Sequence, residues 1–112
     1  MTRVIFFSRD GYGMGVRVEG HSGFDRAGQD TVCAGVSMLI WTLIDMLEDE
    51  PEFYASIRVD ETAPLIEVAC SPDEEAEGRC TYLYEVIYTG MARMAASYPQ
   101  HVELRRETDG DN

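Results

Sequence analysis

Hydrophobic and polar residues alternate in two short stretches near the start of the chain. Residues 3–9 are mainly aromatic and β-branched, and residues 14–18 alternate between large apolar and small or polar side chains. A period of two is typical of a strand with one buried face. Asp10 and Gly11 favour a turn between the stretches, so the pattern predicts a β-hairpin over residues 3–19.

Two later stretches repeat their hydrophobic residues every three or four positions, as a helix with one buried face does. The first is expected to begin at Asp30, a good helix N-cap, and to end at the acidic run before Pro51. The second is expected to begin at Ser71, because a proline follows at the first helical position and Glu74 completes a capping box. It runs to about Tyr98.

Residues 54–60, 64–70 and 102–104 show strand-like patterns. The order β-β-α-β-β-α-β therefore predicts an α+β fold. Its expected form is a two-layer sandwich, with a mostly antiparallel five-stranded sheet and two helices on one face. Residues 1–112 are expected to form a single domain, with residues 107–112 as a frayed polar tail.

Gly35 and Gly90 fall inside the two predicted helices. Each costs about 1 kcal/mol of helix stability relative to alanine. Close approach of another element would explain both glycines, and simple tolerance of the cost is the alternative.

The net charge of the chain indicates which classes of molecule it can bind. The 112 residues include 21 acidic residues against 9 basic ones, all arginine, for a formal net charge of −12. Such a domain repels phosphate backbones, so direct binding of nucleic acid is not expected, whereas basic peptides are attracted. Acidity that only keeps the protein soluble is the alternative. No apolar run approaches the ~18 residues of a membrane span, so no membrane association is expected.

The cysteines and histidines indicate the compartment and argue against a metal site. Three cysteines without an export signal suggest free thiols in a reducing cytoplasm. There is no Cys-x-x-Cys pair, and His21 and His101 lie far apart in the sequence. We therefore expect neither a zinc site nor another cofactor.

Cys33 is the candidate for chemistry on physical grounds. It falls in the first turn of the helix predicted from Asp30. The positive end of the helix dipole and the unpaired N–H groups there favour an anion, and the thiolate is the nucleophilic form of cysteine. The alternative is a small buried residue at the start of an amphipathic helix.

His21 lies twelve residues before Cys33, at the start of a glycine-rich loop. The two ends of such a loop can meet, which would bring an imidazole to the thiol. An imidazole in that position takes the thiol proton and later gives it to the leaving amine. A surface histidine without this role is the alternative.

Three polar residues are candidates to support the pair. Ser37 lies one helical turn after Cys33 on the same face. Asp30 is expected to bond N–H groups of the first turn, and Asp25 can reach His21 from the loop. A carboxylate that orients the imidazole would complete a triad, whereas one against the sulfur would disfavour the thiolate.

The stretches 20–25 and 28–37 together resemble the signature of the ribosomal-processing cysteine protease family, Prp. That signature has Gly-His, a glycine-rich loop and then Asp-x-Val-Cys-Ala-Ala-x-Ser. The similarity extends to chain length and element order, and it departs at Gly35, where the family usually has alanine. The resemblance implies that Cys33 is the nucleophile and that His21 is the base.

The resemblance also implies a function and partners. The family is a homodimeric cysteine endopeptidase that removes a short N-terminal extension from large-subunit ribosomal protein number twenty-seven, after an aromatic residue. That substrate is basic, which agrees with the charge of −12. The alternative is a non-catalytic module that binds a basic ribosomal or assembly protein.

The loop between the two candidate catalytic residues is a candidate substrate-binding segment. Gly23 and Gly28 would let it move over a bound peptide, with Ser22 alongside and Phe24 packed on the aromatic side chain of the peptide. A loop without this role is the alternative.

Overall fold

The computed structural model describes residues 1–9, 11–20, 30–63 and 65–108, with the side chain of Asp30 left out. The elements appear in the predicted order β-β-α-β-β-α-β, with two added 3-10 turns. They are β1 (Thr2–Ser8), β2 (Met14–Glu19), α1 (Asp30–Glu48), η1 (Pro51–Phe53), β3 (Ser56–Asp60), β4 (Leu65–Cys70), η2 (Glu74–Ala76), α2 (Glu77–Ser97) and β5 (Val102–Thr108).

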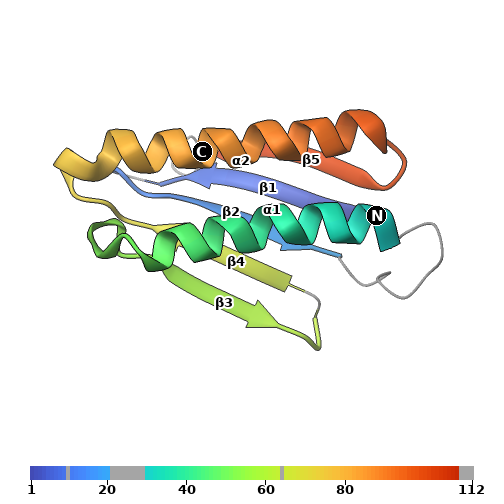
Figure 1. Ribbon diagram of the computed structural model, residues 1–112, viewed down its shortest axis with the longest axis horizontal. Coiled ribbons are helices and arrows are strands. Elements are labelled where there is room, and N and C mark those ends of the chain that lie inside the picture. The colour runs from blue at the N-terminus through green and yellow to red at the C-terminus, as the bar shows by residue number, and fades with distance from the viewer. Residues whose placement is uncertain (10, 21–29, 64, 109–112) are drawn as a thin grey trace.

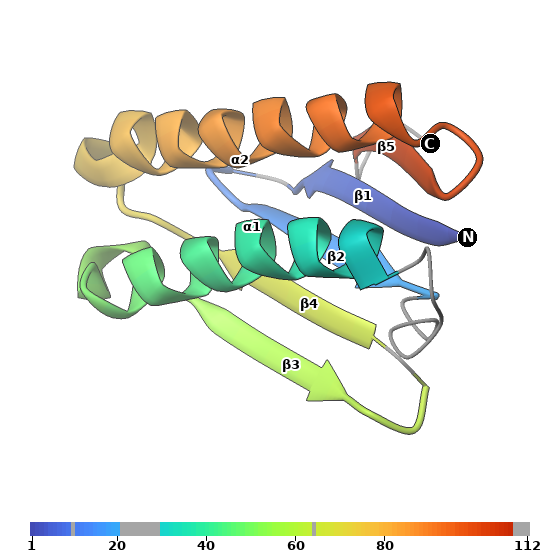
Figure 2. The same ribbon diagram turned by 45° about the vertical axis from the view of Figure 1, so that its right-hand side comes forward.

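The five strands form one sheet in the order β3-β4-β2-β1-β5. Every neighbouring pair is antiparallel except β1 and β5, which are parallel. Both helices cover the same face, α1 over β2 and β4 and α2 over β1 and β5 (Figures 1 and 2). The predicted two-layer α+β sandwich with a mostly antiparallel sheet is confirmed, and β3 is left beyond the edge of the helix layer.

The core lies between the sheet and the two helices. Alternate residues of the central strands, such as Val4, Val16 and Val68, face the helices and are fully buried. Full burial of an aliphatic side chain contributes about 1.5–3 kcal/mol. The helices supply the other half of the core through Val32, Val36, Ile40, Leu43 and Leu47 of α1 and Cys80, Tyr84, Ile87 and Met91 of α2.

Helix α1 is apolar enough to resemble a membrane span, although the sequence contains no uninterrupted apolar run of that length. Residues Thr31–Glu48 are long and apolar enough to cross a membrane by length and composition alone, with a mean hydropathy of 1.5. The core helix of a two-layer fold passes the same test, because one of its faces must be apolar. Here that face packs on the sheet, and the exposed side chains of Met38, Trp41 and Met46 add to the hydropathy of α1.

The opposite face of the sheet carries charged side chains and no helix. Arg58, Glu67 and Arg17 stand in register across β3, β4 and β2. The ion pairs Arg58–Glu67 and Arg17–Glu67 measure 3.2 and 3.6 Å. Partly exposed pairs of this kind contribute at most about 1 kcal/mol each. The same row includes Ile5, which is only 1% exposed between Arg17 and Arg105.

The predicted capping box at Ser71 is wrong. After β4 the chain forms the 3-10 turn η2 and then α2, and neither cap residue, Asp73 or Ala76, makes a side-chain cap hydrogen bond. The backbone N–H of Ser71 donates to the carbonyl of Phe53 at 3.0 Å. That bond ties Ser71 to η1, so α2 begins only at Glu77.

The last strand is longer than predicted. β5 pairs with β1 along its whole length, from Thr2↔Val102 to Ser8↔Thr108. Glu107 and Thr108 therefore belong to the sheet and not to a tail, while residues 109–112 lie outside the described part of the chain.

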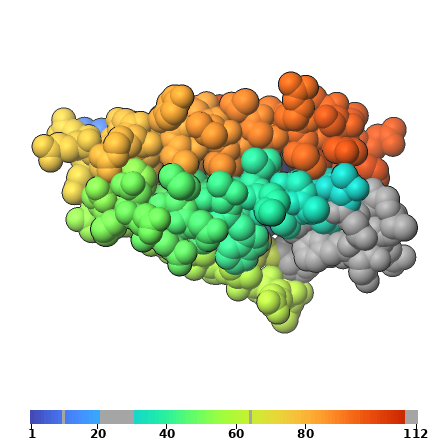
Figure 3. Space-filling view, viewed as in Figure 1, coloured from blue at the N-terminus to red at the C-terminus, as the bar shows by residue number. Residues whose placement is uncertain are grey.

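The two helices approach closely at the two glycines. A Cβ at Gly35 would lie 2.7 Å from the end of the Met94 side chain, and one at Gly90 would lie 2.5 Å from Leu39. The two helices form a continuous outer surface (Figure 3). Close approach, rather than tolerance, therefore explains both glycines.

Candidate active site

Cys33 lies in the first turn of α1. The helix includes Asp30 as its first residue, so Cys33 is the fourth helical residue, one position later than predicted. The shift leaves Cys33 at the positive end of the helix dipole, which acts over the first turn. Its side chain is 7% exposed, so the thiol lies within the protein at the N-terminal end of α1.

Ser37 follows Cys33 by one turn and is half-buried. Residues two positions apart on a helix point about 200° apart. Gly35 faces α2 through Met94, so Cys33 and Ser37 lie on the opposite flank of α1, toward β4 and β3. The structure thus places these two predicted site residues together, on the flank of α1 that faces away from α2.

Three exposed apolar residues that the sequence did not single out lie further along α1 and on β3. Trp41 is one turn beyond Ser37 and is 43% exposed. Ile57 and Val59 of β3 stand on the helix-facing side of the sheet, in register with Val68 and Ile66, yet they are 39% and 45% exposed. Their alternation indicated a strand with a buried face. They are exposed because β3 lies beyond the edge of the helix layer.

The other predicted site residues fall where the structure is not described. Gly20, the last described residue before them, has φ +72°, and a Cβ there would lie 2.7 Å from the Met1 carbonyl oxygen. Strand β2, which Gly20 follows, ends at the end of the sheet where α1 begins (Figures 1 and 2). Outside the described residues lie His21, Ser22, Gly23, Phe24, Asp25, Gly28 and the side chain of Asp30.

The other two cysteines belong to the core. Cys70 and Cys80 are 2% and 0% exposed, and the Tyr84 hydroxyl donates to the Cys70 sulfur at 3.3 Å. The hydrogen bond between the Cys80 thiol and Cys70, together with burial, holds the pKa of Cys80 well above its usual range. This thiol therefore stays protonated. The hydrogen bonds from Cys80 and Tyr84 lower the pKa of Cys70, but Cys70 is buried in the core, where a peptide cannot reach it. Cys33, at the end of a helix, remains the candidate nucleophile.

A metal centre has no basis in the described part of the chain. No group of three or more His, Cys, Asp or Glu residues that could hold a metal ion occurs there.

The described residues also enclose a cavity of about 370 Å³. Its lining includes Tyr12 from the β1–β2 turn, Glu77 from α2 and Arg106 from β5, but not Cys33. These segments meet at the end of the molecule opposite the start of α1 (Figure 1). The cavity is therefore separate from the candidate nucleophile.

Comparison with known proteins places this geometry in context. The family model described as cysteine protease Prp matches residues 1–103, and no curated protein matches. Among solved structures, SMU.848 from Streptococcus mutans is 26% identical, with 97% of this chain and 96% of that chain covered and a TM-score of 0.79.

The ribosomal processing protease Prp from S. aureus has the same fold in two solved complexes. The complex with a substrate peptide is 15% identical, with a TM-score of 0.75, and the complex with a covalently linked product peptide is 17% identical, with a TM-score of 0.77. In both comparisons 95% of this chain and 99% of the other are covered.

Proposed function

The chain belongs to the cysteine protease Prp family and is a cysteine-type endopeptidase, and we propose that it removes the N-terminal extension of large-subunit ribosomal protein number twenty-seven during ribosome assembly. The observation that carries the proposal is the position of Cys33 in the first turn of α1, in a chain whose fold matches a ribosomal processing protease that binds a substrate peptide. The formal net charge of −12 suits a basic substrate.

In the proposed mechanism, Cys33 and His21 act as a dyad. His21 takes the thiol proton, and the sulfur attacks the carbonyl carbon of the scissile peptide bond. The imidazolium returns the proton to the leaving amine, and water then hydrolyses the thioester. Asp25 or Asp30 would orient the imidazole, with Ser37 alongside. Support comes from β2, which ends at Glu19, two residues before His21, at the end of the molecule where α1 begins.

The aromatic residue before the cleaved bond would contact the three exposed apolar residues on α1 and β3, namely Trp41, Ile57 and Val59. An aromatic side chain gains free energy by covering them. The segment with Ser22, Gly23, Phe24 and Gly28 would close over the peptide from the other side.

The test of the nucleophile is cleavage of a synthetic peptide that carries the extension. Cys33→Ser keeps the size of the side chain and should abolish cleavage, while Cys80→Ala should still cut, with some loss of stability from its small core cavity. Cleavage by Cys33→Ser at the wild-type rate would contradict the proposal.

The test of the base uses the two histidines as a matched pair. His21→Ala should lower turnover by about 10²-fold or more, the usual contribution of general acid–base catalysis. His101→Ala should stay within about twofold of the wild type, because the proposed mechanism uses His21 alone. Equal effects of the two substitutions would remove His21 from the mechanism.

We extend the proposal to a homodimer in the cytoplasm. No disulfide joins Cys33, Cys70 or Cys80, which suits a reducing compartment. The outer surface of the helix layer exposes Met38 at 70%, Tyr82 at 73% and Val86 at 50%, and clustered exposed apolar side chains favour association. Sedimentation should show a dimer that Val86→Glu weakens and Ser56→Glu, an exposed position on β3 away from the helix layer, does not.

A further inference from the structure

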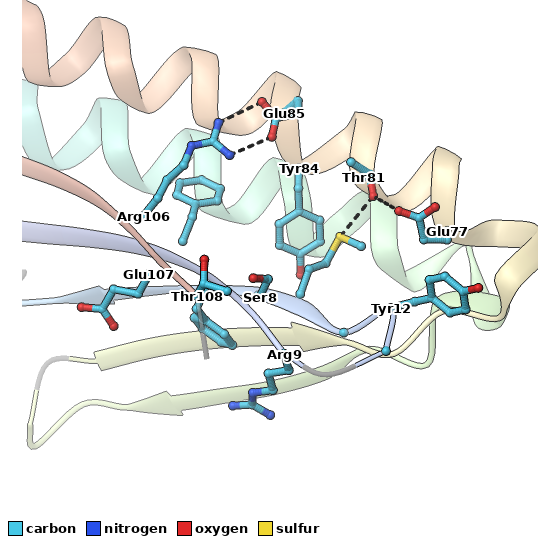
Figure 4. Close-up of a pocket in the computed structure, with 16 residues that line it drawn as sticks. Ser8, Arg9, Tyr12, Glu77, Thr81, Tyr84, Glu85, Arg106, Glu107 and Thr108 are labelled. Atoms are coloured by element: carbon cyan, nitrogen blue, oxygen red, sulfur yellow. Dashed lines mark hydrogen bonds and ion pairs between the residues drawn. The ribbon is translucent and has the colours of Figure 1, made fainter. Parts of the chain in front are cut away.

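The cavity opposite the candidate nucleophile has aromatic walls. It lies between the β1–β2 turn, the first turns of α2 and the last residues of β5 (Figure 4). Phe6 and Tyr84 are buried in its wall at 6% and 4% exposure, whereas Tyr12 is 44% exposed. The volume of about 370 Å³ suffices for one long side chain.

The charges in this cavity are unevenly compensated. Glu85 accepts two hydrogen bonds from Arg106, at 2.9 and 3.0 Å, and the guanidinium lies 3.6 Å above the Tyr88 ring. Glu77 accepts one hydrogen bond, from the Thr81 hydroxyl at 2.8 Å. In the part of the chain that the structure describes, no arginine forms an ion pair with Glu77. The charge of Glu77 is therefore available to a ligand.

The remaining cation of the lining points elsewhere. The Arg9 guanidinium lies 4.9 Å over the Phe7 ring, and in Figure 4 it points away from Glu77. Tyr12 and Glu77 line the same end of the cavity (Figure 4). That end thus combines an aromatic ring with an uncompensated carboxylate.

We propose that this cavity binds a lysine or arginine side chain of the protein substrate, as a second contact remote from the cleaved bond. The ring of Tyr12 and the carboxylate of Glu77 attract the cationic head, while Phe6 and Tyr84 pack against the aliphatic stem. This inference rests on the proposed function for the identity of the basic partner.

The distance between the cavity and Cys33 sets how long a substrate must be to bind in the cavity and at the cleavage site at the same time. Arg79 of α2 pairs with Glu50 and Glu52, which directly follow α1, so the first turn of α2 lies at the C-terminal end of α1. From Cys33 to Glu48 the helix rises about 22 Å at ~1.5 Å per residue. An extended peptide needs about seven residues to span that distance.

Binding is measured on the Cys33→Ala protein, so the result does not depend on cleavage. The probe is fluorescein-labelled hexalysine, followed by fluorescence anisotropy at low salt. Glu77→Gln and Tyr12→Ala should each weaken binding about threefold or more. Two matched controls remove the same groups outside the cavity, Glu75→Gln and Tyr54→Ala, and each should change binding by less than about twofold.

Three results would overturn the inference. Equal weakening by the controls would mean that hexalysine binds the general acidity of the surface. Unchanged binding in both cavity variants would place the peptide elsewhere, and binding of labelled hexaglutamate in preference to hexalysine would reverse the charge of the ligand. Failure of the proposed function would appear separately, as a wild-type protein that binds hexalysine through Glu77 but does not cut the extension peptide.

Discussion

Three glycine-to-alanine substitutions test the helix contact that joins α1 to α2. Gly35 and Gly90 lie inside the two helices and face each other's helix, while Gly78 lies in the first turn of α2 with no atom within 4 Å of an added Cβ. All three replacements gain the same helix propensity, about 0.5–1 kcal/mol. They differ in what the new methyl group meets.

The contacts predict a different change in stability for each substitution. Gly78→Ala should stabilise the protein by about 0.5–1 kcal/mol. At Gly35 the methyl meets the end of Met94 at 2.7 Å, and that flexible side chain can move, so the net change should be close to zero or slightly stabilising. At Gly90 the methyl meets both branches of Leu39, at 2.5 and 3.1 Å. Overpacking costs about 1–3 kcal/mol, so Gly90→Ala should destabilise by about 1 kcal/mol.

Urea unfolding followed by circular dichroism measures these differences, and thermal unfolding should show Gly90→Ala lower by roughly 4 °C. The m-value should stay constant, because none of the substitutions changes the surface exposed on unfolding. If Gly90→Ala stabilised as much as Gly78→Ala, the helices would not touch at Leu39, and the explanation given for both internal glycines would be wrong.

Three other predictions concern reactivity, salt and pH. Iodoacetamide should label Cys33 faster than Cys70 or Cys80 in the folded protein, and mass spectrometry that found equal rates would contradict an activated thiol. Higher salt should raise KM for a basic substrate peptide and leave kcat unchanged, while an uncharged peptide with the same cleavage site should show neither effect. The hydrogen bonds from Arg106 lower the pKa of Glu85, so the pair stabilises the protein above the ordinary carboxyl pKa and loses that effect as pH falls through the lowered value. Glu85→Gln should cost about 0.5 kcal/mol at neutral pH, because the pair is half-exposed, and less as acid protonates the wild-type carboxyl in pH-dependent urea unfolding.

Local periodicity was sufficient to predict the elements and their order. The alternation in residues 3–19 depends only on neighbouring side chains, and β1 and β2 form the predicted antiparallel hairpin. The helical repeat from Asp30 likewise gave α1 to within one residue of its start. Both signals are short-range, which is why a single sequence contains them.

Long-range pairing was the part that periodicity could not supply. β5 extends to Thr108 because β1 supports it along its whole length in a parallel register, although Arg105 and Arg106 gave it no apolar pattern. In the same way, the exposure of Ile57 and Val59 depends on where the helices lie over the sheet. Neither the length of β5 nor the exposure of β3 can be predicted from the residues of the strand alone.

The same distinction between local and long-range signals applies to the candidate site and the cavity. The stretch from His21 to Cys33 is continuous in sequence, so the motif could be recognised directly. The cavity is built from three segments that are distant in the sequence, with Tyr12, Glu77 and Arg106 contributed by different elements. None of these residues has a local signal that sets it apart from other exposed polar or aromatic residues.

The fold also changes how the net charge of −12 acts. Arg3, Arg17 and Arg58 are paired with glutamates on the open face of the sheet, so that face is close to neutral. Acidic residues gather instead at the end where α1 finishes and α2 begins, in residues 48–50 and 73–77. Arg79 compensates only Glu50 among them in the ion pairs of the described residues. That end lies about 22 Å from Cys33 along α1 at ~1.5 Å per residue, more than two Debye lengths of about 8 Å at physiological salt. The acidic end can therefore attract a basic protein without placing a repulsive charge beside the thiolate, which separates capture of the substrate from the chemistry at Cys33.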